Sequence, residues 1–270
     1  MNKRFRLIAL DVDGTIRDRE RQISSRTRNA IDRVRESGAY VTLATGRTFL
    51  SALNASTDLG LTCPIITFQG AHVAMPSGDL LWHTPLTSQM TETALDALSG
   101  RDEFDVMAYY GNDIFVVEMS EWALDYGKRN SIPIRVVEQD EIRSGPMTRL
   151  VVRGDDDAIE SLEVELNDRF DGALYVTRSL SYFCEILHPD AGKDKAIEWL
   201  CDHLDIDPSD TLAFGNGYND IEMLSTAGLG VAVDGGVPQA IAAADLVAPS
   251  MEDDGVARVL EYLLDGGYVG

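Results

Sequence analysis

The first third of the chain alternates between short apolar runs and amphipathic segments. Residues 5–12 are almost continuously apolar, which predicts a strand with both faces covered, as in a parallel sheet. Ser24 or Ser25 is a suitable N-cap for a helix that ends at Gly38. The next expected elements are strands at 40–44 and 64–68 and, between them, a helix at 49–59. This βαβαβ order predicts the start of a doubly wound parallel sheet.

The last third resumes the same alternation. Lys193 begins a predicted helix that turns Ala196, Ile197 and Leu200 to one side. The later elements expected are strands at 211–214, 230–233 and 246–247 and helices at 220–227, at 238–243 and around 256–263. The two ends of the chain therefore belong to one α/β domain.

The middle of the chain has a different pattern, and Pro85 and Pro189 lie at its two ends. The segments expected there are a hairpin at 105–109 and 114–118, strands at 150–152 and 182–187, and helices near 88–99, 120–130 and 156–169. Together they predict an α+β unit with an antiparallel sheet. We expect residues 85–187 to be an insertion into a core domain made of 1–84 and 188–270.

Composition narrows the functional classes. The 270 residues are 44% hydrophobic, and no apolar run is long enough to span a membrane. The formal net charge of −22 predicts that the surface repels nucleic acids and anionic membranes. The three cysteines have no metal-ligand spacing and are typical of buried residues in a reducing cytoplasm. The basic N-terminus precedes an apolar run too short for a signal peptide, so we expect a cytoplasmic protein.

Two carboxylates stand at the end of the first predicted strand. Asp11 and Asp13 are two residues apart, so their side chains point to the same side of an extended chain. Gly14 allows a sharp turn directly after them. Carboxylates next to an apolar core are costly unless other groups compensate them. Because ligands of open parallel sheets bind at the carboxyl ends of strands, we expect the compensating groups at neighbouring strand ends.

Three other segments supply polar groups at that edge of the sheet. They are Thr45-Gly46-Arg47 after the second strand, Lys193 at a helix start and Gly215–Asp220 after the strand at 211–214. The chain has only four lysines, so a lysine at this helix start is informative, and Lys195 is the less favoured alternative. We expect an ammonium, a hydroxyl and two amide groups to converge on the carboxylates.

Such a set of groups suits phosphoryl transfer. A carboxylate meets like charge on a phosphate monoester, and at about 4 Å and an effective dielectric constant near 20 each charge pair costs on the order of 4 kcal/mol. An ammonium and Mg²⁺ offset this repulsion. We predict that Asp11 attacks phosphorus, and that Asp13 protonates the leaving oxygen and then deprotonates water. The other predicted roles are phosphate binding by Thr45, charge neutralisation by Lys193 and metal binding by Asn216 and Asp220.

The ordered motifs at 11–15 (DVDGT), 45–47 (TGR), Lys193 and 215–220 (GNGYND) resemble the four motifs of the haloacid dehalogenase (HAD) superfamily. The position of the insertion and the segment NDIEML at 219–224 resemble its Cof-type sugar-phosphatase branch. The resemblance spans nearly the whole chain. It implies a Rossmann-like core, a mobile inserted cap domain, Mg²⁺ and hydrolysis of small phosphorylated metabolites. It also implies that Asp11 and the backbone carbonyl of Asp13 contact the metal.

Two residues depart from the family pattern. Asn216 stands where the family usually has Asp, and Gln69 stands where it usually has Asn. An amide oxygen still ligates Mg²⁺, but one negative charge is missing. We therefore expect metal binding that is weaker by the ~10–100-fold typical of altered metal-site neighbours. The longer amide of Gln69 is expected to shift whatever its loop contacts.

Four residues are expected to bind substrate, namely Thr45, Gly46, Arg47 and Asn219. Arg47 has the alternative of forming only an ion pair, and Asn219 has the alternative of only capping a helix.

The function expected from the sequence is Mg²⁺-dependent hydrolysis of a small phosphomonoester, such as a sugar phosphate, by a monomer or homodimer. One alternative is a phosphotransferase or phosphomutase, which passes the phosphoryl group to a second hydroxyl through the same residues. The other is a phosphometabolite-binding protein that has little turnover because of Asn216. Retention of Asp11, Asp13 and Lys193 argues against a mere binding protein, since binding needs no nucleophile.

Overall fold

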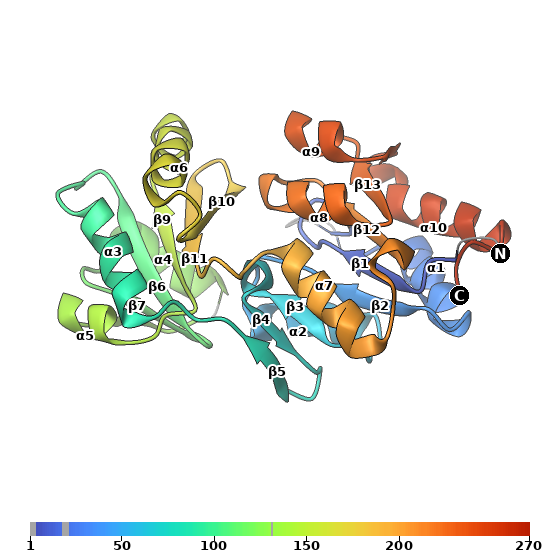
Figure 1. The fold of residues 1–270 in the computed structure, drawn as a ribbon, viewed down its shortest axis with the longest axis horizontal. Helices are drawn as coiled ribbons and strands as arrows, with labels where there is room; N and C mark the ends of the chain where they lie inside the picture. The colour runs from blue at the N-terminus through green and yellow to red at the C-terminus, as the bar shows by residue number, and fades with distance from the viewer. Residues whose placement is uncertain (1–3, 18–21, 131) are drawn as a thin grey trace. The chain divides into compact units, whose positions relative to one another are not determined.

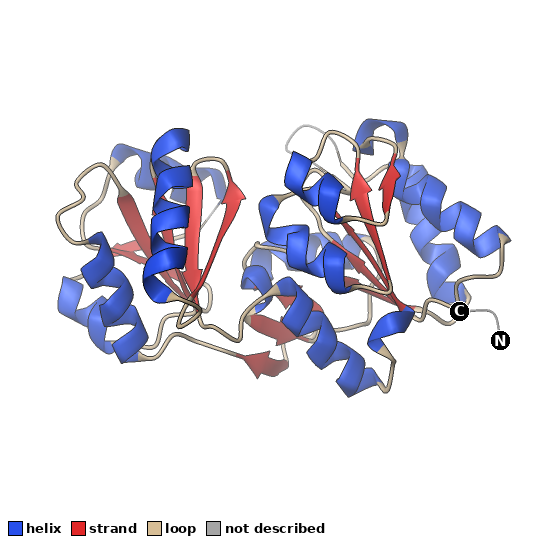
Figure 2. Cartoon of the chain, turned by 45° about the horizontal axis from the view of Figure 1, so that its top comes forward, coloured by secondary structure: helices blue, strands red, loops and turns tan. Residues whose placement is uncertain are grey.

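The computed structural model describes residues 4–17, 22–130 and 132–270. The chain divides into two compact units, one formed by the residues up to Trp82 together with Gly192–Gly270 and the other by His83–Ala191. Each unit combines strands and helices (Figure 2). The insertion expected at 85–187 lies within the second unit.

The first unit contains a five-stranded sheet in the order β14-β13-β12-β1-β2, and every neighbouring pair is parallel. Its strands are β1 (Leu7–Leu10), β2 (Tyr40–Leu43), β12 (Thr211–Gly215), β13 (Leu229–Val233) and β14 (Leu246–Ala248). The interior strand β1 pairs with both β2 and β12, so segments from the two ends of the sequence share one sheet (Figure 1).

Helices cover both faces of this sheet. Ile8 and Leu10 of β1 pack in one apolar cluster, whereas Leu7 and Ala9 pack in another. The first cluster includes side chains from α1 (Ser25–Glu36), α2 (Phe49–Asp58) and α10 (Gly255–Asp265). On the other face lie α7 (Lys193–Leu204), α8 (Ile221–Thr226) and α9 (Pro238–Ala243). This arrangement confirms the predicted doubly wound α/β core.

The strand predicted at 64–68 was expected to extend the parallel sheet, but the structure places it in another sheet. A separate three-stranded sheet contains β3 (Ile65–Thr67), β4 (His72–Ala74) and β5 (Leu80–His83). β3 pairs antiparallel with β4, and an isolated parallel bridge between Ala44 and Ile66 ties it to the end of β2. The physical reason is a tight turn at 68–70, which sends the chain directly back along β3.

The second unit has a six-stranded sheet in the order β10-β11-β9-β6-β7-β8, in which only the β7–β8 pair is parallel. Its strands are β6 (Asp105–Tyr110), β7 (Asp113–Val116), β8 (Ile134–Val136), β9 (Arg149–Arg153), β10 (Tyr175–Leu180) and β11 (Phe183–Leu187). Its helices are α3 (Ser88–Leu98), α4 (Glu121–Asn130), α5 (Gln139–Ser144) and α6 (Asp156–Phe170). Side chains from α3, α5 and α6 form one apolar core with this sheet. The inserted unit is α+β, as predicted, although β8, α5 and β10 were not expected.

In the described part of the first unit, single 3-10 turns lie at Phe68–Gly70, Pro208–Asp210, Tyr218–Asp220 and Met251–Asp253. No helix among the described residues has the length and apolar composition needed to cross a bilayer.

Candidate active site

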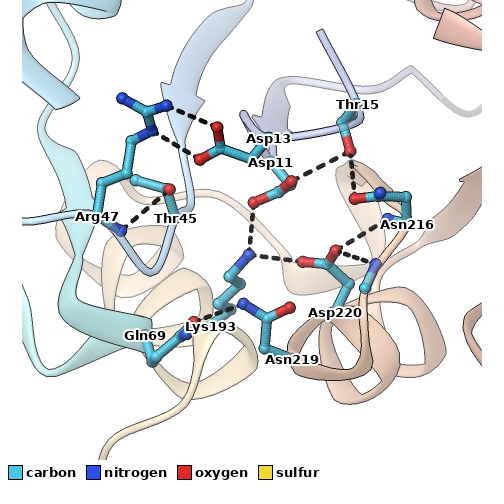
Figure 3. Close-up of polar contacts among 11 residues, drawn as sticks. Asp11, Asp13, Thr15, Thr45, Arg47, Gln69, Lys193, Asn216, Asn219 and Asp220 are labelled. Carbon is cyan, nitrogen blue, oxygen red and sulfur yellow. Dashed lines mark hydrogen bonds and ion pairs between the residues drawn. The ribbon is translucent and has the colours of Figure 1, made fainter. Parts of the chain in front are cut away.

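Predicted site residues from four segments meet at the carboxyl edge of the parallel sheet (Figure 3). Asp11 directly follows β1, and its backbone N–H donates to the carbonyl of Phe214 in β12 at 2.9 Å. Thr45 follows β2, and Lys193 is the first residue of α7. Asp220 closes the 3-10 turn that follows β12. The parallel pairing of β2, β1 and β12 explains why residues far apart in the sequence become neighbours.

Lys193 lies between two carboxylates. Its Nζ donates to Asp11 Oδ1 at 2.7 Å and to Asp220 Oδ1 at 2.6 Å. The three residues are buried, with exposed fractions of 1% for Lys193, 5% for Asp11 and 0% for Asp220. A buried charge is tolerated when it is paired and hydrogen-bonded. Here the Lys193 ammonium is paired and hydrogen-bonded with both carboxylates.

Burial and charge shift the pKa values of two members of the triad. Burial and the carboxylate of Asp220 raise the pKa of Asp11 to about 7, although Lys193 acts in the opposite direction. Burial by itself lowers the pKa of Lys193, but Asp11 and Asp220 outweigh it and hold this pKa above its ordinary value. The lysine is therefore charged at neutral pH.

Thr15 links Asp11 to the loop that follows β12. Its Oγ1 lies 3.2 Å from Asp11 Oδ2 and 3.1 Å from Asn216 Oδ1. Gly14 has φ 83°, and a Cβ there would clash with the Asn216 amide, so glycine permits the close approach of the two loops. Thr15 was not among the site residues expected from the sequence. The available signal was a hydroxyl residue directly after two carboxylates and a glycine turn.

Asp220 holds the loop as well as the lysine. Its Oδ2 accepts hydrogen bonds from the backbone N–H groups of Asn216 and Gly217, both at 2.9 Å. Because Oδ1 contacts Lys193, both carboxylate oxygens of Asp220 already have donors. This geometry suits Asp220 to fixing its neighbours in place.

Asp13 pairs with Arg47 rather than with the lysine. Two hydrogen bonds of 2.6 Å join the guanidinium to both carboxylate oxygens of Asp13. The side chains are 48% exposed for Asp13 and 24% exposed for Arg47. Arg47 thus forms the ion pair that the sequence analysis considered, and its partner is the predicted acid–base residue. In the same loop the backbone N–H of Arg47 donates to Thr45 Oγ1 at 3.2 Å.

Asn219 contacts Gln69. Its Nδ2 donates to Gln69 Oε1 at 2.8 Å, and both residues are buried. The glutamine amide also packs against Gly46, where an added Cβ would clash with Nε2. Gln69 departs from the family pattern in the sequence, but it was not among the site residues expected from it.

Oxygen groups suited to a hard divalent cation converge beside Asp11. The Asp11 carboxylate and the Asn216 amide oxygen lie on either side of the Thr15 hydroxyl. Among the residues that the structure describes, no three His, Cys, Asp or Glu side chains form a metal-binding group. A cation here would depend on amide and backbone oxygens and on water. Mg²⁺ fits such a set, since it prefers oxygen ligands and keeps several waters.

The doubly wound sheet, the α+β insertion and the buried Asp–Lys–Asp triad at the sheet edge define a hydrolase of the HAD type. The model of the family described as haloacid dehalogenase-like hydrolase matches residues 8–260, so the chain belongs to this family. This membership, in the Cof-type branch, confirms the resemblance found in the sequence.

Two curated relatives are named phosphatases. The chain is 28% identical over 259 residues to the 5-amino-6-(5-phospho-D-ribitylamino)uracil phosphatase YitU of Bacillus subtilis, covering 94% of this chain and 96% of that protein. It is 28% identical over 238 residues to the HMP-PP phosphatase of Cronobacter sakazakii, covering 88% and 87% respectively. The prediction of an enzyme, a HAD-type phosphatase, is confirmed.

The solved structure of the HAD subclass IIB sugar phosphatase BT4131 superposes with a TM-score of 0.84 at 22% identity, covering 96% of this chain and 98% of that one. At this identity the likeness shows the shared fold.

Proposed function

We propose that the protein is a Mg²⁺-dependent phosphomonoester hydrolase that acts on small phosphorylated metabolites through an aspartyl-phosphate intermediate. The observation that carries the proposal is Asp11, a buried carboxylate held 2.7 Å from an ammonium at the carboxyl end of an interior strand. The relatives named for a ribitylaminouracil phosphate and for HMP-PP support a small phosphorylated substrate.

In the first half-reaction an oxygen of Asp11 attacks phosphorus, so that a bond from Asp11 to phosphorus forms as the bond to the ester oxygen breaks. Asp13 donates a proton to the departing oxygen, and the product leaves as an alcohol. The Lys193 ammonium and the Thr45 hydroxyl bind phosphoryl oxygens and offset the charge that Asp11 meets.

In the second half-reaction water attacks the phosphorus of the aspartyl-phosphate. Asp13, now a carboxylate, accepts the proton of that water. The bond to Asp11 breaks, inorganic phosphate leaves and the carboxylate is restored. Arg47 orients Asp13 through their two hydrogen bonds, and Arg47, Gly46 and Asn219 complete the proposed substrate site.

Asp11, Asn216 and the backbone carbonyl of Asp13 are the groups that we propose to hold Mg²⁺, which supplies positive charge at the phosphoryl group. Asp220 acts on the metal site indirectly, because its carboxylate fixes Lys193 and the backbone of 216–217.

We assign the inserted unit the role of a cap that excludes bulk water and selects the leaving group. The proposed location is the cytoplasm, supported by three buried cysteines that carry free thiols.

A screen of sugar phosphates and related metabolites, with and without Mg²⁺, tests the proposal. Asp11→Asn should lower turnover by roughly 10⁴-fold or more, the scale seen when a nucleophile is removed, with the fold preserved by circular dichroism. Asp202→Asn makes the same change on the exposed side of α7 and should keep wild-type turnover. Wild-type-like activity of Asp11→Asn would remove Asp11 as the nucleophile. Product analysis with a sugar acceptor separates hydrolysis from phosphoryl transfer.

A further inference from the structure

In the turn after β3, the buried residue Gln69 has an unfavourable backbone conformation. Gln69 has φ 56° and ψ 31°, in the left-handed region where residues other than Gly, Asn and Asp are uncommon. Phe68 and Gly70 on either side also have positive φ angles, of 51° and 89°. Glycine would adopt this conformation at lower cost, so the fold alone does not account for glutamine here. A strained backbone persists where the surrounding contacts determine it, and such positions cluster at functional sites.

The side-chain amide of Gln69 joins two loops of the candidate active site. Its Oε1 accepts the hydrogen bond of 2.8 Å from Asn219 Nδ2. Its Nε2 lies against Gly46, since a Cβ at Gly46 would clash with that atom. The backbone N–H of Gln69 donates to the Thr45 carbonyl at 3.2 Å. Gln69 therefore contacts the 45–46 loop on one side and Asn219 on the other.

The next residue reaches the start of α7. Gly70 packs so closely on the carbonyl of Gly192 that an added Cβ would clash with it, and the same Cβ would lie 2.9 Å from the backbone nitrogen of Lys193. The turn that carries Gln69 thus lies directly against the peptide that precedes the buried lysine.

We propose that Gln69 is a positioning residue for the phosphate site. Its amide holds Asn219 and the Thr45–Gly46 loop in one arrangement, so that both meet the same phosphoryl group together with Lys193. Gln69 is fully buried, and it acts through these neighbours without touching the ligand. The identity of the ligand rests on the proposed function.

Gln69→Met tests the proposal, because methionine keeps the length and volume of glutamine and removes both polar ends of the amide. Calorimetric titration with inorganic phosphate in the presence of Mg²⁺ should show about tenfold weaker binding, the scale of lost positioning contacts. The KM for an aryl phosphate should rise by a similar factor, with little change in Tm. If Gln69→Met does not fold, Gln69→Gly relieves the backbone strain and makes the same test.

Thr67→Val is the matched control. It removes a buried hydroxyl two residues away, which contacts His72 Nδ1 at 3.0 Å, and it should leave phosphate affinity and KM unchanged. Asn219→Ala supplies a double-mutant cycle. If Gln69 acts through Asn219, Gln69→Met should weaken phosphate binding less in the Asn219→Ala background than in the wild type. Fully additive effects would overturn the proposal.

The phosphate titration separates this inference from the proposed function. A wild-type protein that hydrolyses phosphomonoesters while Gln69→Met binds phosphate normally would overturn the role of Gln69 alone. A wild-type protein that binds phosphate in a Gln69-dependent way without any turnover would overturn the proposed hydrolysis alone. A wild-type protein that neither binds nor hydrolyses would overturn both.

Discussion

The charge of single side chains sets the chemistry available at the edge of the parallel sheet. Asp11 is buried beside Asp220, and these surroundings raise its pKa to about 7. Lys193 compensates part of this cost. Asn216 contributes an oxygen near the Thr15 hydroxyl without a further negative charge. An aspartate at 216 would repel the Asp11 carboxylate in the metal-free protein. It would also attract a bound cation more strongly, so the residue at 216 affects both the stability of the metal-free site and its affinity for the cation.

Asn216→Asp should lower the Mg²⁺ concentration needed for half-maximal activity, by about tenfold, because one more carboxylate would face the cation. Measuring turnover across a Mg²⁺ titration checks this. Asn54→Asp makes the same change on the exposed surface of α2 and should leave the titration where it is. An unchanged Mg²⁺ requirement in Asn216→Asp would place residue 216 outside the metal ligands.

The sequence predicted which residues of the candidate site come together better than it predicted their partners. Asp11, Lys193 and Asp220 follow from strand ends and a helix start, because parallel topology brings such positions to one edge. The Asp13–Arg47 pair and the Gln69–Asn219 contact depend on which way side chains turn within a crowded loop. That choice depends on three-dimensional packing, which spacing along the chain does not encode.

At the scale of elements, the turn at 68–70 sets how closely β3 approaches the start of α7. Gly70→Ala should lower both stability and turnover, because the new methyl group meets the Gly192 carbonyl and displaces the peptide before Lys193. Gly78 is the matched control, since it also has a positive φ, of 96°, but an added Cβ there meets nothing within 4 Å.

Both alanine variants carry the cost of a left-handed backbone, about 1–2 kcal/mol. The excess loss of stability in Gly70→Ala, measured by urea unfolding, and a turnover at least about tenfold lower than that of Gly78→Ala would report the contact with α7. Equal stability and turnover in the two variants would contradict it.

Elements with apolar residues along one side were predicted well from the sequence, whereas elements that depend on contacts with residues distant in the sequence were not. Helix α1 buries Thr27, Ala30, Ile31 and Val34, and its N-cap Ser24 accepts a hydrogen bond from the Thr27 N–H, as the pattern indicated. Strand β10 was missed because it buries Arg178. Glu163 of α6 lies 2.6 Å from that guanidinium. A buried arginine gives a polar signal in the sequence, and only the tertiary ion pair makes the position compatible with a strand.

At the scale of the whole molecule, the acidic composition is the dominant electrostatic feature. The formal net charge is −22 over 270 residues. Exposed ion pairs such as Arg26–Glu261 and Arg33–Asp265 join α1 to α10. Each such exposed pair is worth about 0–1 kcal/mol, and salt weakens it. Repulsion among the excess carboxylates destabilises the folded state, and salt reduces this repulsion by screening it. The two effects have opposite signs.

With so large an excess of acidic residues, we expect screening of repulsion to win. The Tm should therefore rise between about 0.05 M and 1 M KCl, most steeply at low ionic strength, where the Debye length shortens from roughly 14 Å to 3 Å. Differential scanning calorimetry at fixed pH checks this. A parallel series in sucrose at matched osmolality separates charge screening from exclusion of solute at the surface. A Tm that falls as KCl increases would mean that the exposed ion pairs, rather than the net charge, govern the stability of the fold.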